Sequence, residues 1–291
     1  IVSALAFAVL LYLGELIYFK GLIGISESGA KRRKLVVSDI EKTAVWGNAV
    51  WTYAITELKI LCRTPVYFLN CVLISFIWPV FFLYPVLAQS VDASFIYQIE
   101  AFLLNPDAWG VALCGAFALS LFLGGNNTVT ATAISREGQD LYVKKYLPIS
   151  YKDQIKAKIY SGLILGYISI FMMVLSAIFV LRLPLLMTVL ILATSWLGIR
   201  FTAYTGILLD LYNPKLKWNS EQQAVKQNMN VVFNMLIGMG LAAATMAVAI
   251  KLSISLWMAF AALYVVFGGL NILISKLVYT KGPDRLMELE G

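Results

Sequence analysis

Long apolar runs dominate the chain, and short polar segments separate them. Seven runs approach or exceed the roughly 20 apolar residues that a helix needs to cross the hydrocarbon core of a bilayer. Transmembrane β-strands would instead show alternating polarity over segments of about ten residues. The pattern therefore predicts an all-α integral membrane protein with about seven transmembrane helices, over 1–19, 65–88, 108–130, 158–181, 185–209, 229–250 and 254–279.

Composition agrees with this class and narrows the chemistry. The mean hydropathy is +0.80 and 13% of residues are charged, far outside the range of soluble globular domains. The sequence has no histidine and three cysteines without paired spacing, so it offers no pattern for a metal site or a disulfide. Neither a P-loop nor the hydrolase and zinc-protease motifs occur. We therefore expect no enzymatic activity and no cofactor in this chain.

Positive charge predicts the orientation in the membrane. Nearly all of the 23 Lys and Arg residues fall in 20–63, 131–158, 215–226 and 276–285, whereas the opposite loops hold only Arg182 and Lys251. Because cytoplasmic loops collect Lys and Arg, these segments and the tail 280–291 are expected to be cytoplasmic. The net charge of +7 then reflects topology and anionic lipid, and it does not indicate nucleic-acid binding.

The segment before the run 65–88 predicts a basic linker over 20–46 and an amphipathic helix over 47–64. Apolar residues recur there at helical spacing, while polar residues follow the opposite face and Pro65 then turns the chain. Such a helix suits the membrane interface. The residues expected to place it there are Trp51, Ile55, Leu58, Lys59 and Arg63. An ordinary juxtamembrane helix is the alternative.

The loop 132–157 contains "SREGQDLYVKKYLPIS", which mixes charge with aromatic and aliphatic residues. Gly138 and Pro148 predict breaks on either side of a short helix. Ser150 with Asp153 predicts the N-terminus of the next long helix. A short helix held at both ends suits docking to a partner, and a solvated loop is the alternative. Further along, Trp218 between two lysines suggests an anchor at headgroup level.

Inside the apolar runs, few polar residues are candidates for function. Arg200 is a strong charge within a run and either snorkels toward the interface or faces a water-filled cavity. Asn126, Asn127 and Thr130 close the run 108–130, where they serve either helix packing or a translocation pathway. These four residues are the candidates for such a pathway.

Three stretches resemble bacterial ABC exporter permeases of the type-2 class. They are "TAISREGQDLYVKKYLPISYKDQIKAK" (132–158), "LDLYNPKLKWNSEQQAVKQN" (209–228) and "TELKILCRTPVYFLN" (56–70). The resemblance implies a permease half in which an interfacial connecting helix precedes six transmembrane helices, here 65–279. The helix 1–19 would then end an N-terminal permease half that precedes it in a longer chain, and 20–46 would link the halves.

The resemblance also implies a partner and a mechanism. The loop 132–157 would hold a coupling helix that docks on a separate cytoplasmic ATPase, expected as a dimer that binds ATP and Mg. The protein would lie in the bacterial plasma membrane and export a substrate that the sequence does not identify. The residues expected to couple to the ATPase are Ser135, Arg136, Glu137, Gly138, Tyr142, Lys144, Lys145, Tyr146, Leu147, Pro148, Ser150 and Asp153.

Two other functions remain open at this point. One is an ATP-independent channel or secondary transporter, although such carriers place paired ionisable groups near the midplane and this chain offers Arg200 alone. The other is a membrane scaffold that transports nothing. Transport that depends on ATP distinguishes an exporter from a channel or secondary transporter. The identity of the bound partner distinguishes an exporter from a scaffold.

Overall fold

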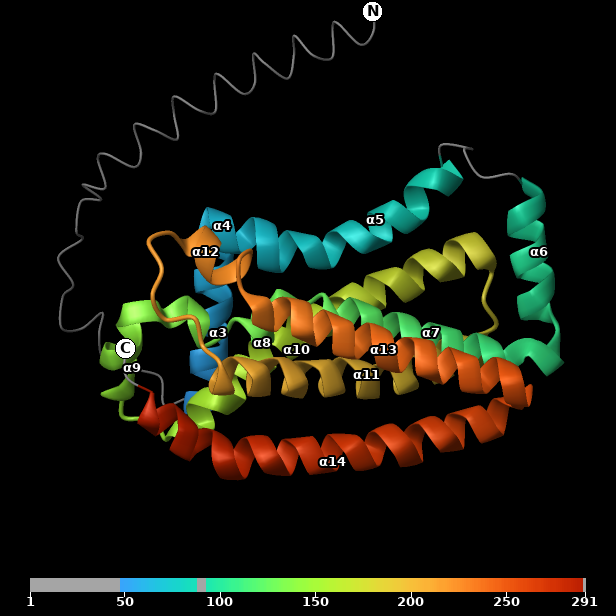
Figure 1. Cartoon of the computed structure of the whole chain (residues 1–291). Coiled ribbons are helices and arrows are strands. Elements are labelled where there is room, and N and C mark those ends of the chain that lie inside the picture. The colour runs from blue at the N-terminus through green and yellow to red at the C-terminus, as the bar shows by residue number, and fades with distance from the viewer. Residues whose placement is uncertain (1–47, 88–92, 290–291) are drawn as a thin grey trace, which may run out of the picture. The chain divides into compact units, whose positions relative to one another are not determined.

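The computed structural model describes residues 48–87 and 93–289, and every regular element in this part of the chain is a helix (Figure 1). The all-α expectation is thus confirmed for these residues. Five helical segments are long and apolar enough to cross a membrane. They are Pro106–Gly138, which includes α7 (Trp109–Gly125), then α10 (Tyr151–Leu181), α11 (Leu185–Tyr212), Glu221–Leu252, which includes α13 (Met229–Leu252), and α14 (Leu256–Glu288).

The run expected at 65–88 is broken into short pieces and follows a sharp bend. It consists of α4 (Pro65–Tyr67), a π-helical stretch η1 (Phe68–Val72) and α5 (Leu73–Leu87). The preceding helix α3 (Ala49–Arg63) makes an angle of 93° with Pro65–Phe81. Thr64 is extended, with φ −88° and ψ 112°, as expected before a proline that begins a helix. If this bent pair counts as one span, the described residues hold up to six spans. The expected helix 1–19 and linker 20–46 lie outside them.

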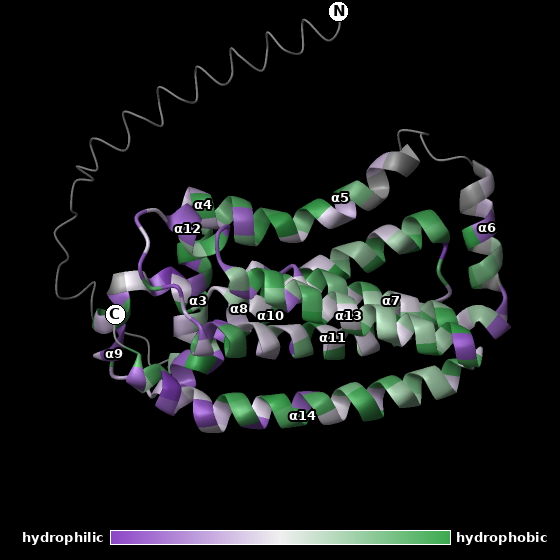
Figure 2. Cartoon of the chain, in the orientation of Figure 1, coloured by the Kyte–Doolittle hydropathy of each residue, from purple (hydrophilic) through white to green (hydrophobic). Residues whose placement is uncertain are grey.

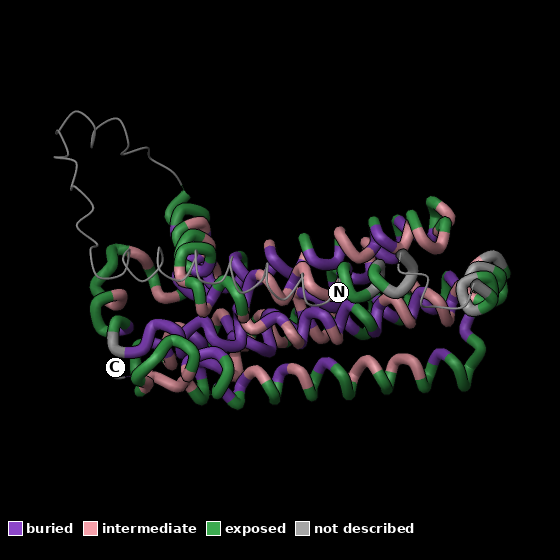
Figure 3. Tube along the Cα trace, turned by 90° about the horizontal axis from the view of Figure 1, so that it is seen from above, coloured by how far each residue is buried: buried purple, intermediate pink, exposed green. Residues whose placement is uncertain are grey.

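The spans differ strongly in burial. In α7 and α11 the most apolar window is 61% buried, whereas in α13 it is 11% buried and in α14 22%. Buried positions in Figure 3 accordingly follow the inner helices. Close packing at the centre depends on small residues, since a Cβ on Gly238 would lie 2.7 Å from the carbonyl oxygen of Leu121. The helices α7 and α11 form the core, and α13 and α14 present apolar side chains outward.

The end of the bundle where α10 ends contains a helix that the sequence pattern did not predict. The helix α6 (Ala93–Leu104) and the short η2 (Pro106–Ala108) precede α7. Asn105 caps η2 by accepting a hydrogen bond from the Asp107 N–H at 3.1 Å. The Trp109 indole N–H donates to the Leu103 carbonyl at 2.6 Å and ties α6 to α7.

Polar residues gather at the other end of the bundle, as Figure 2 shows. Four short helices meet there: α8 (Thr128–Ala131), η3 (Ser135–Asp140), α9 (Leu141–Lys145) and α12 (Glu221–Val225). The helix α3 packs against the first half of α10 at this end, and α12 packs against η3. We call this region the polar end, and it holds the site described next.

Candidate functional site

Five charged side chains from four helices meet beneath α9, and we call this group the ion-pair cluster. It consists of Glu57 from α3, Arg136 and Glu137 from η3, Lys144 from α9 and Lys158 from α10. Four of the five are buried, and Lys144 is half-buried. Charged groups at such positions need partners, because desolvation otherwise disfavours the charged state.

The two carboxylates receive the three cations at short distances. The Lys158 Nζ lies 2.5 Å from Glu137 Oε1 and 3.3 Å from Glu57 Oε1. The Lys144 Nζ lies 2.9 Å from Glu137 Oε1 and 3.4 Å from Glu57 Oε1. The Arg136 Nη2 lies 3.7 Å from Glu57 Oε2. Both lysines therefore bridge the same two carboxylates and link α9, α10, η3 and α3.

Neutral groups form further hydrogen bonds with the charged side chains of the cluster. The Lys158 ammonium also donates to the Ala133 carbonyl at 3.1 Å. Arg136 Nη1 donates to the Val129 carbonyl and to Thr132 Oγ1, both at 2.7 Å. The Tyr53 hydroxyl donates to Glu137 Oε1 at 3.3 Å. These bonds fix the side chains in one arrangement, which a set of exposed ion pairs would not do.

The charge balance of the cluster favours ionised carboxylates. Burial alone would raise the pKa of Glu57, but Lys158, Lys144 and Arg136 outweigh it and lower that pKa to about 2. Three cations face two carboxylates, so the cluster holds one excess positive charge. The cluster lies at the polar end of the bundle, where α3 packs against the first half of α10.

A third buried carboxylate, Asp210 near the end of α11, holds the backbone just before the cluster. Its Oδ2 accepts the N–H groups of Ile134 at 2.6 Å and Ser135 at 3.0 Å, and its Oδ1 accepts the Ser135 hydroxyl. The Asn230 amide at the start of α13 donates to Asp210 Oδ1 at 3.0 Å. Asp210 thus joins α11, α13 and η3.

Trp218 packs on the same segment from the other side. Its indole N–H donates to the Ser135 carbonyl at 2.8 Å, and the Lys215 N–H donates to Ser135 Oγ at 2.9 Å. Gly138 adopts φ +52°, and a Cβ there would lie 2.8 Å from the Trp218 ring. Trp218 therefore packs within the polar end, and its role as a headgroup anchor stays a prediction. The expected break at Gly138 is confirmed.

Above the cluster, α9 exposes an aromatic and aliphatic surface. Tyr142 is 61% exposed and Tyr146 72%, and Val143 and Leu147 are exposed beside them. The Tyr146 hydroxyl donates to the Tyr142 hydroxyl at 2.8 Å, and the two rings pack edge to face at 5.1 Å. This hydrogen bond raises the pKa of Tyr146, because deprotonation would abolish it. We call these four residues the α9 surface.

The residues expected to couple to an ATPase fall into two groups. Ser135, Arg136, Glu137 and Gly138 are buried, so a partner does not reach them directly in this structure. By contrast, the remaining ones lie at or near the surface: Tyr142, Lys144, Lys145, Tyr146, Leu147, Pro148, Ser150 and Asp153. The helix α9 is also shorter than expected, because η3 occupies the residues before Leu141.

Two local predictions in this loop are borne out in detail. Ser150 caps α10, since its Oγ accepts the Asp153 N–H at 3.1 Å and donates to the Asp153 carboxylate at 2.7 Å. The chain is irregular around Pro148.

The Lys145 Nζ donates to the Met287 carbonyl at 3.0 Å, so the end of α14 also supports α9.

On α3 the expected faces are correct in part. Trp51, Lys59 and Arg63 are exposed, and Ile55 and Leu58 are half-buried. The sequence reasoning missed Glu57 and Tyr53, which point into the protein with Ala54 and Leu61. A signal was present, because Glu57 lies at helical spacing between Ala54 and Leu61 on the apolar face. Lys158, Asp210 and Asn230 were missed as well.

The candidates for a translocation pathway do not come together. Asn127 caps α8 and donates to the Gly162 carbonyl at 3.1 Å, and Asn126 donates to the Phe122 carbonyl at 2.8 Å within its own helix end. Thr130 is buried against α10 and α11. Arg200 lines a different cavity, on the side of the bundle formed by α10, α11 and α14. Asn126, Asn127 and Thr130 thus occupy packing and capping positions.

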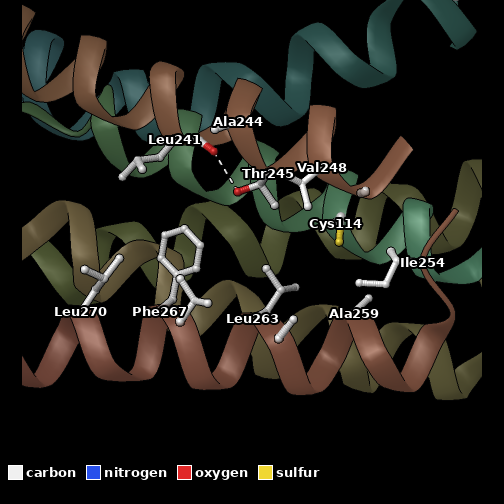
Figure 4. Close-up of a pocket in the computed structure, with 13 residues that line it drawn as sticks. Cys114, Leu241, Ala244, Thr245, Val248, Ile254, Ala259, Leu263, Phe267 and Leu270 are labelled. Atoms are coloured by element: carbon white, nitrogen blue, oxygen red, sulfur yellow. Dashed lines mark hydrogen bonds between the residues drawn. The ribbon is translucent and has the colours of Figure 1, made fainter. Parts of the chain in front are cut away.

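A further cavity of about 270 Å³ lies between α7, α13 and α14 (Figure 4). Its lining is almost entirely aliphatic and aromatic, with side chains such as Leu241, Leu263 and Phe267. The Thr245 hydroxyl is satisfied by the Leu241 carbonyl at 2.8 Å. Such a lining suits hydrocarbon and presents no group for chemistry.

Over residues 48–87 and 93–289, the fold and the site define an all-helical membrane-protein class, with five helices able to span a membrane and a charged, rigidly connected polar end. Comparison of the chain with protein families, curated proteins and solved structures gives no match.

Proposed function

We propose that this chain is the transmembrane permease subunit of an ATP-driven exporter of the bacterial plasma membrane. A separate cytoplasmic ATPase dimer would supply ATP and Mg, and the chain itself would catalyse nothing. In this proposal the polar end faces the cytoplasm, α3 lies in the membrane interface, and residues 1–19 end an N-terminal permease half. The chain would carry an unidentified substrate out of the cell.

One observation supports the proposal above the others: the exposed α9 surface is rigidly connected to several spans. Lys144 extends from α9 into the ion-pair cluster, which includes Lys158 of α10. Just before η3, Asp210 connects the same segment to α11 and α13. A force applied to Tyr142 and Tyr146 would therefore move whole helices. A solvated loop would need no such support.

Burial and exposure assign different roles to the two groups of residues expected to couple to an ATPase. Tyr142, Val143, Tyr146 and Leu147 supply apolar and aromatic area for direct contact, which is the composition of protein–protein contact centres. Arg136 and Glu137 transmit position from beneath, because both are buried in the ion-pair cluster. This replaces the expectation that these two residues touch the ATPase themselves.

The proposal is tested by photocrosslinking in intact cells. A benzophenone amino acid replaces Tyr146 in the full-length protein, and crosslinked partners are identified by mass spectrometry. We expect an ATPase subunit with a P-loop. The matched control is Phe179, which is 77% exposed near the end of α10 that lies away from the polar end and should give no ATPase crosslink.

Either of two results would overturn the proposal. One is the absence of any P-loop protein from crosslinks at both Tyr142 and Tyr146 in cells that contain the folded protein. The other is transport into inverted vesicles that continues unchanged without ATP, which would favour a channel or secondary transporter. Capture of a partner without a P-loop at Tyr146 would point to a scaffold.

A further inference from the structure

A groove on the side of the bundle contains a cation, Arg200, that has no acidic partner among the residues that the structure describes. The cavity measures about 540 Å³ and lies between α10, α11 and α14, with Trp51 of α3 at its border. Aromatic side chains form much of its wall, including Tyr160, Tyr167 and Trp196. Arg200 projects into this space, and none of the residues lining it is a carboxylate.

Neighbouring aromatic residues fix the Arg200 side chain, but not all of its N–H groups have a hydrogen-bond partner. Its guanidinium lies 4.6 Å from the centre of the Trp196 ring, and its Nη2 donates to the Tyr204 hydroxyl at 3.2 Å. Its Nε is buried and has no hydrogen-bond partner among the described residues. The Tyr167 hydroxyl in the same groove has none either. The Arg200 Nε–H and the Tyr167 hydroxyl are thus buried donors without a hydrogen-bond acceptor, which is a costly state for a polar group.

A phosphate group fits this arrangement better than other acceptors. The planar guanidinium presents several N–H donors in a fork that matches phosphate oxygens, and stacking on Trp196 preorganises it. A phenolic hydroxyl supplies one more donor. Lys156 at the border adds positive charge, although Asp153 pairs with it at 3.0 Å. Because none of the described residues that line the groove is a carboxylate, the cation of a zwitterionic headgroup would have no acidic partner there.

The surroundings favour a lipid over a free ion. Arg200 lies ten residues before Asp210, which is about 15 Å along α11 from the polar end. Tyr160 and Trp196 are 40% and 44% exposed, so aromatic side chains of the groove reach the outer surface of the bundle, which in a spanning protein contacts lipid. The apolar side chains of Leu163 and Ile164 continue the groove along α10. Free phosphate would use the cation and leave this apolar wall uncovered.

We propose that this groove binds the phosphate headgroup of an anionic phospholipid of the leaflet at the polar end. Arg200 and Tyr167 hold the phosphate oxygens, and Trp196 and Tyr160 border the headgroup. The inference needs only that the chain spans a membrane and is independent of the exporter proposal. Its failure would leave the crosslinking result at Tyr146 unaffected.

The test is native mass spectrometry of the full-length protein in mild detergent. Phosphatidylglycerol and phosphatidylcholine with identical acyl chains are titrated against the wild type, Arg200→Gln, Tyr167→Phe and Arg63→Gln. The last variant removes an exposed positive charge from α3 and leaves the groove intact. We expect the wild type to bind phosphatidylglycerol more tightly than phosphatidylcholine, because only phosphatidylcholine brings a second cation beside Arg200. Arg200→Gln should abolish this preference and weaken phosphatidylglycerol binding about tenfold, since it removes hydrogen bonds to a charged group. Tyr167→Phe should weaken phosphatidylglycerol binding about threefold, and Arg63→Gln should change neither quantity.

Four results would overturn the inference. The wild type shows no preference between the two lipids. Arg63→Gln weakens binding as much as Arg200→Gln, which would indicate non-specific charge. Millimolar inorganic phosphate displaces the lipid, so a free anion is the ligand. Arg200→Gln changes the oligomeric mass, so the groove contacts a second copy. If Arg200→Gln fails to fold, Tyr167→Phe alone decides, because it removes one hydroxyl that has no partner, and an unchanged affinity for phosphatidylglycerol counts against the site.

Discussion

Lys158 and Glu137 form the shortest ion pair of the cluster, with Nζ and Oε1 2.5 Å apart and the lysine fully buried. The two residues lie on either side of α9, so their contact closes the loop 138–157 onto the start of α10. Removal of one partner leaves the other charge buried with fewer partners, which is the costly outcome for a buried pair.

A double-mutant cycle should therefore show strong coupling between these residues. Lys158→Met and Glu137→Gln each destabilise the protein, and we expect the double variant to be about 1–3 kcal/mol more stable than the sum of the single effects implies. Thermal and denaturant unfolding in detergent measure the effect. The exposed pair Arg285 and Glu288, 3.1 Å apart, is the control, and its coupling should stay below about 0.5 kcal/mol. Additive effects at Lys158 and Glu137 would contradict the role given to the cluster.

Glu57→Gln should destabilise the protein by about 3 kcal/mol near neutral pH, because three cations then share one carboxylate. The exposed Glu221→Gln is the control and should have little effect. The pKa of Glu57 is lowered to about 2 in the folded protein, so its contribution is complete above the unfolded pKa near 4.3 and disappears as the pH falls toward 2. The stability difference between wild type and Glu57→Gln should be constant from pH 5 to 8, on the order of the same 3 kcal/mol, and shrink below about pH 4. A difference that grows on acidification would refute this account.

Asp210→Asn should loosen the segment before η3. An amide in place of the carboxylate turns one acceptor into a donor that faces the N–H groups of Ile134 and Ser135. We expect a loss of about 2 kcal/mol and faster tryptic cleavage after Lys144 and Lys145 in the detergent-solubilised protein. Asp284→Asn changes an exposed carboxylate of α14 and should alter neither. Unchanged cleavage in Asp210→Asn would show that other contacts hold the loop.

Gly138→Ala should destabilise the polar end by about 1–3 kcal/mol, because φ +52° strains any residue with a Cβ and the Trp218 ring lies 2.8 Å from it. Gly240→Ala is a matched control in α13, where a Cβ meets nothing within 4 Å. That change should be neutral or stabilising by up to about 1 kcal/mol, since alanine favours a helix. Equal melting temperatures for the two variants would be inconsistent with this packing.

Local rules made the elements of this protein predictable. Continuous apolar runs gave the long helices because a run of that length can bury its surface only as a helix. Pro65 and Ser150 marked helix starts, and Gly138 a break, because each acts on the backbone within a few residues. The helix α6 escaped prediction because its sequence lies between turn-like residues and lacks a long run.

Pairing between distant residues was decided by the tertiary structure alone. Glu57 and Lys158 are 101 positions apart, and Ser135 and Trp218 are 83 apart. A charged residue in a sequence names no partner, so Arg136 and Glu137 were expected at a surface. Packing of α3 across α10 buried them instead and brought opposite charges within a few ångströms. The sequence by itself thus determined where the chain becomes helical, and the packing of those helices decided which charges became internal connections and which aromatic residues stayed exposed.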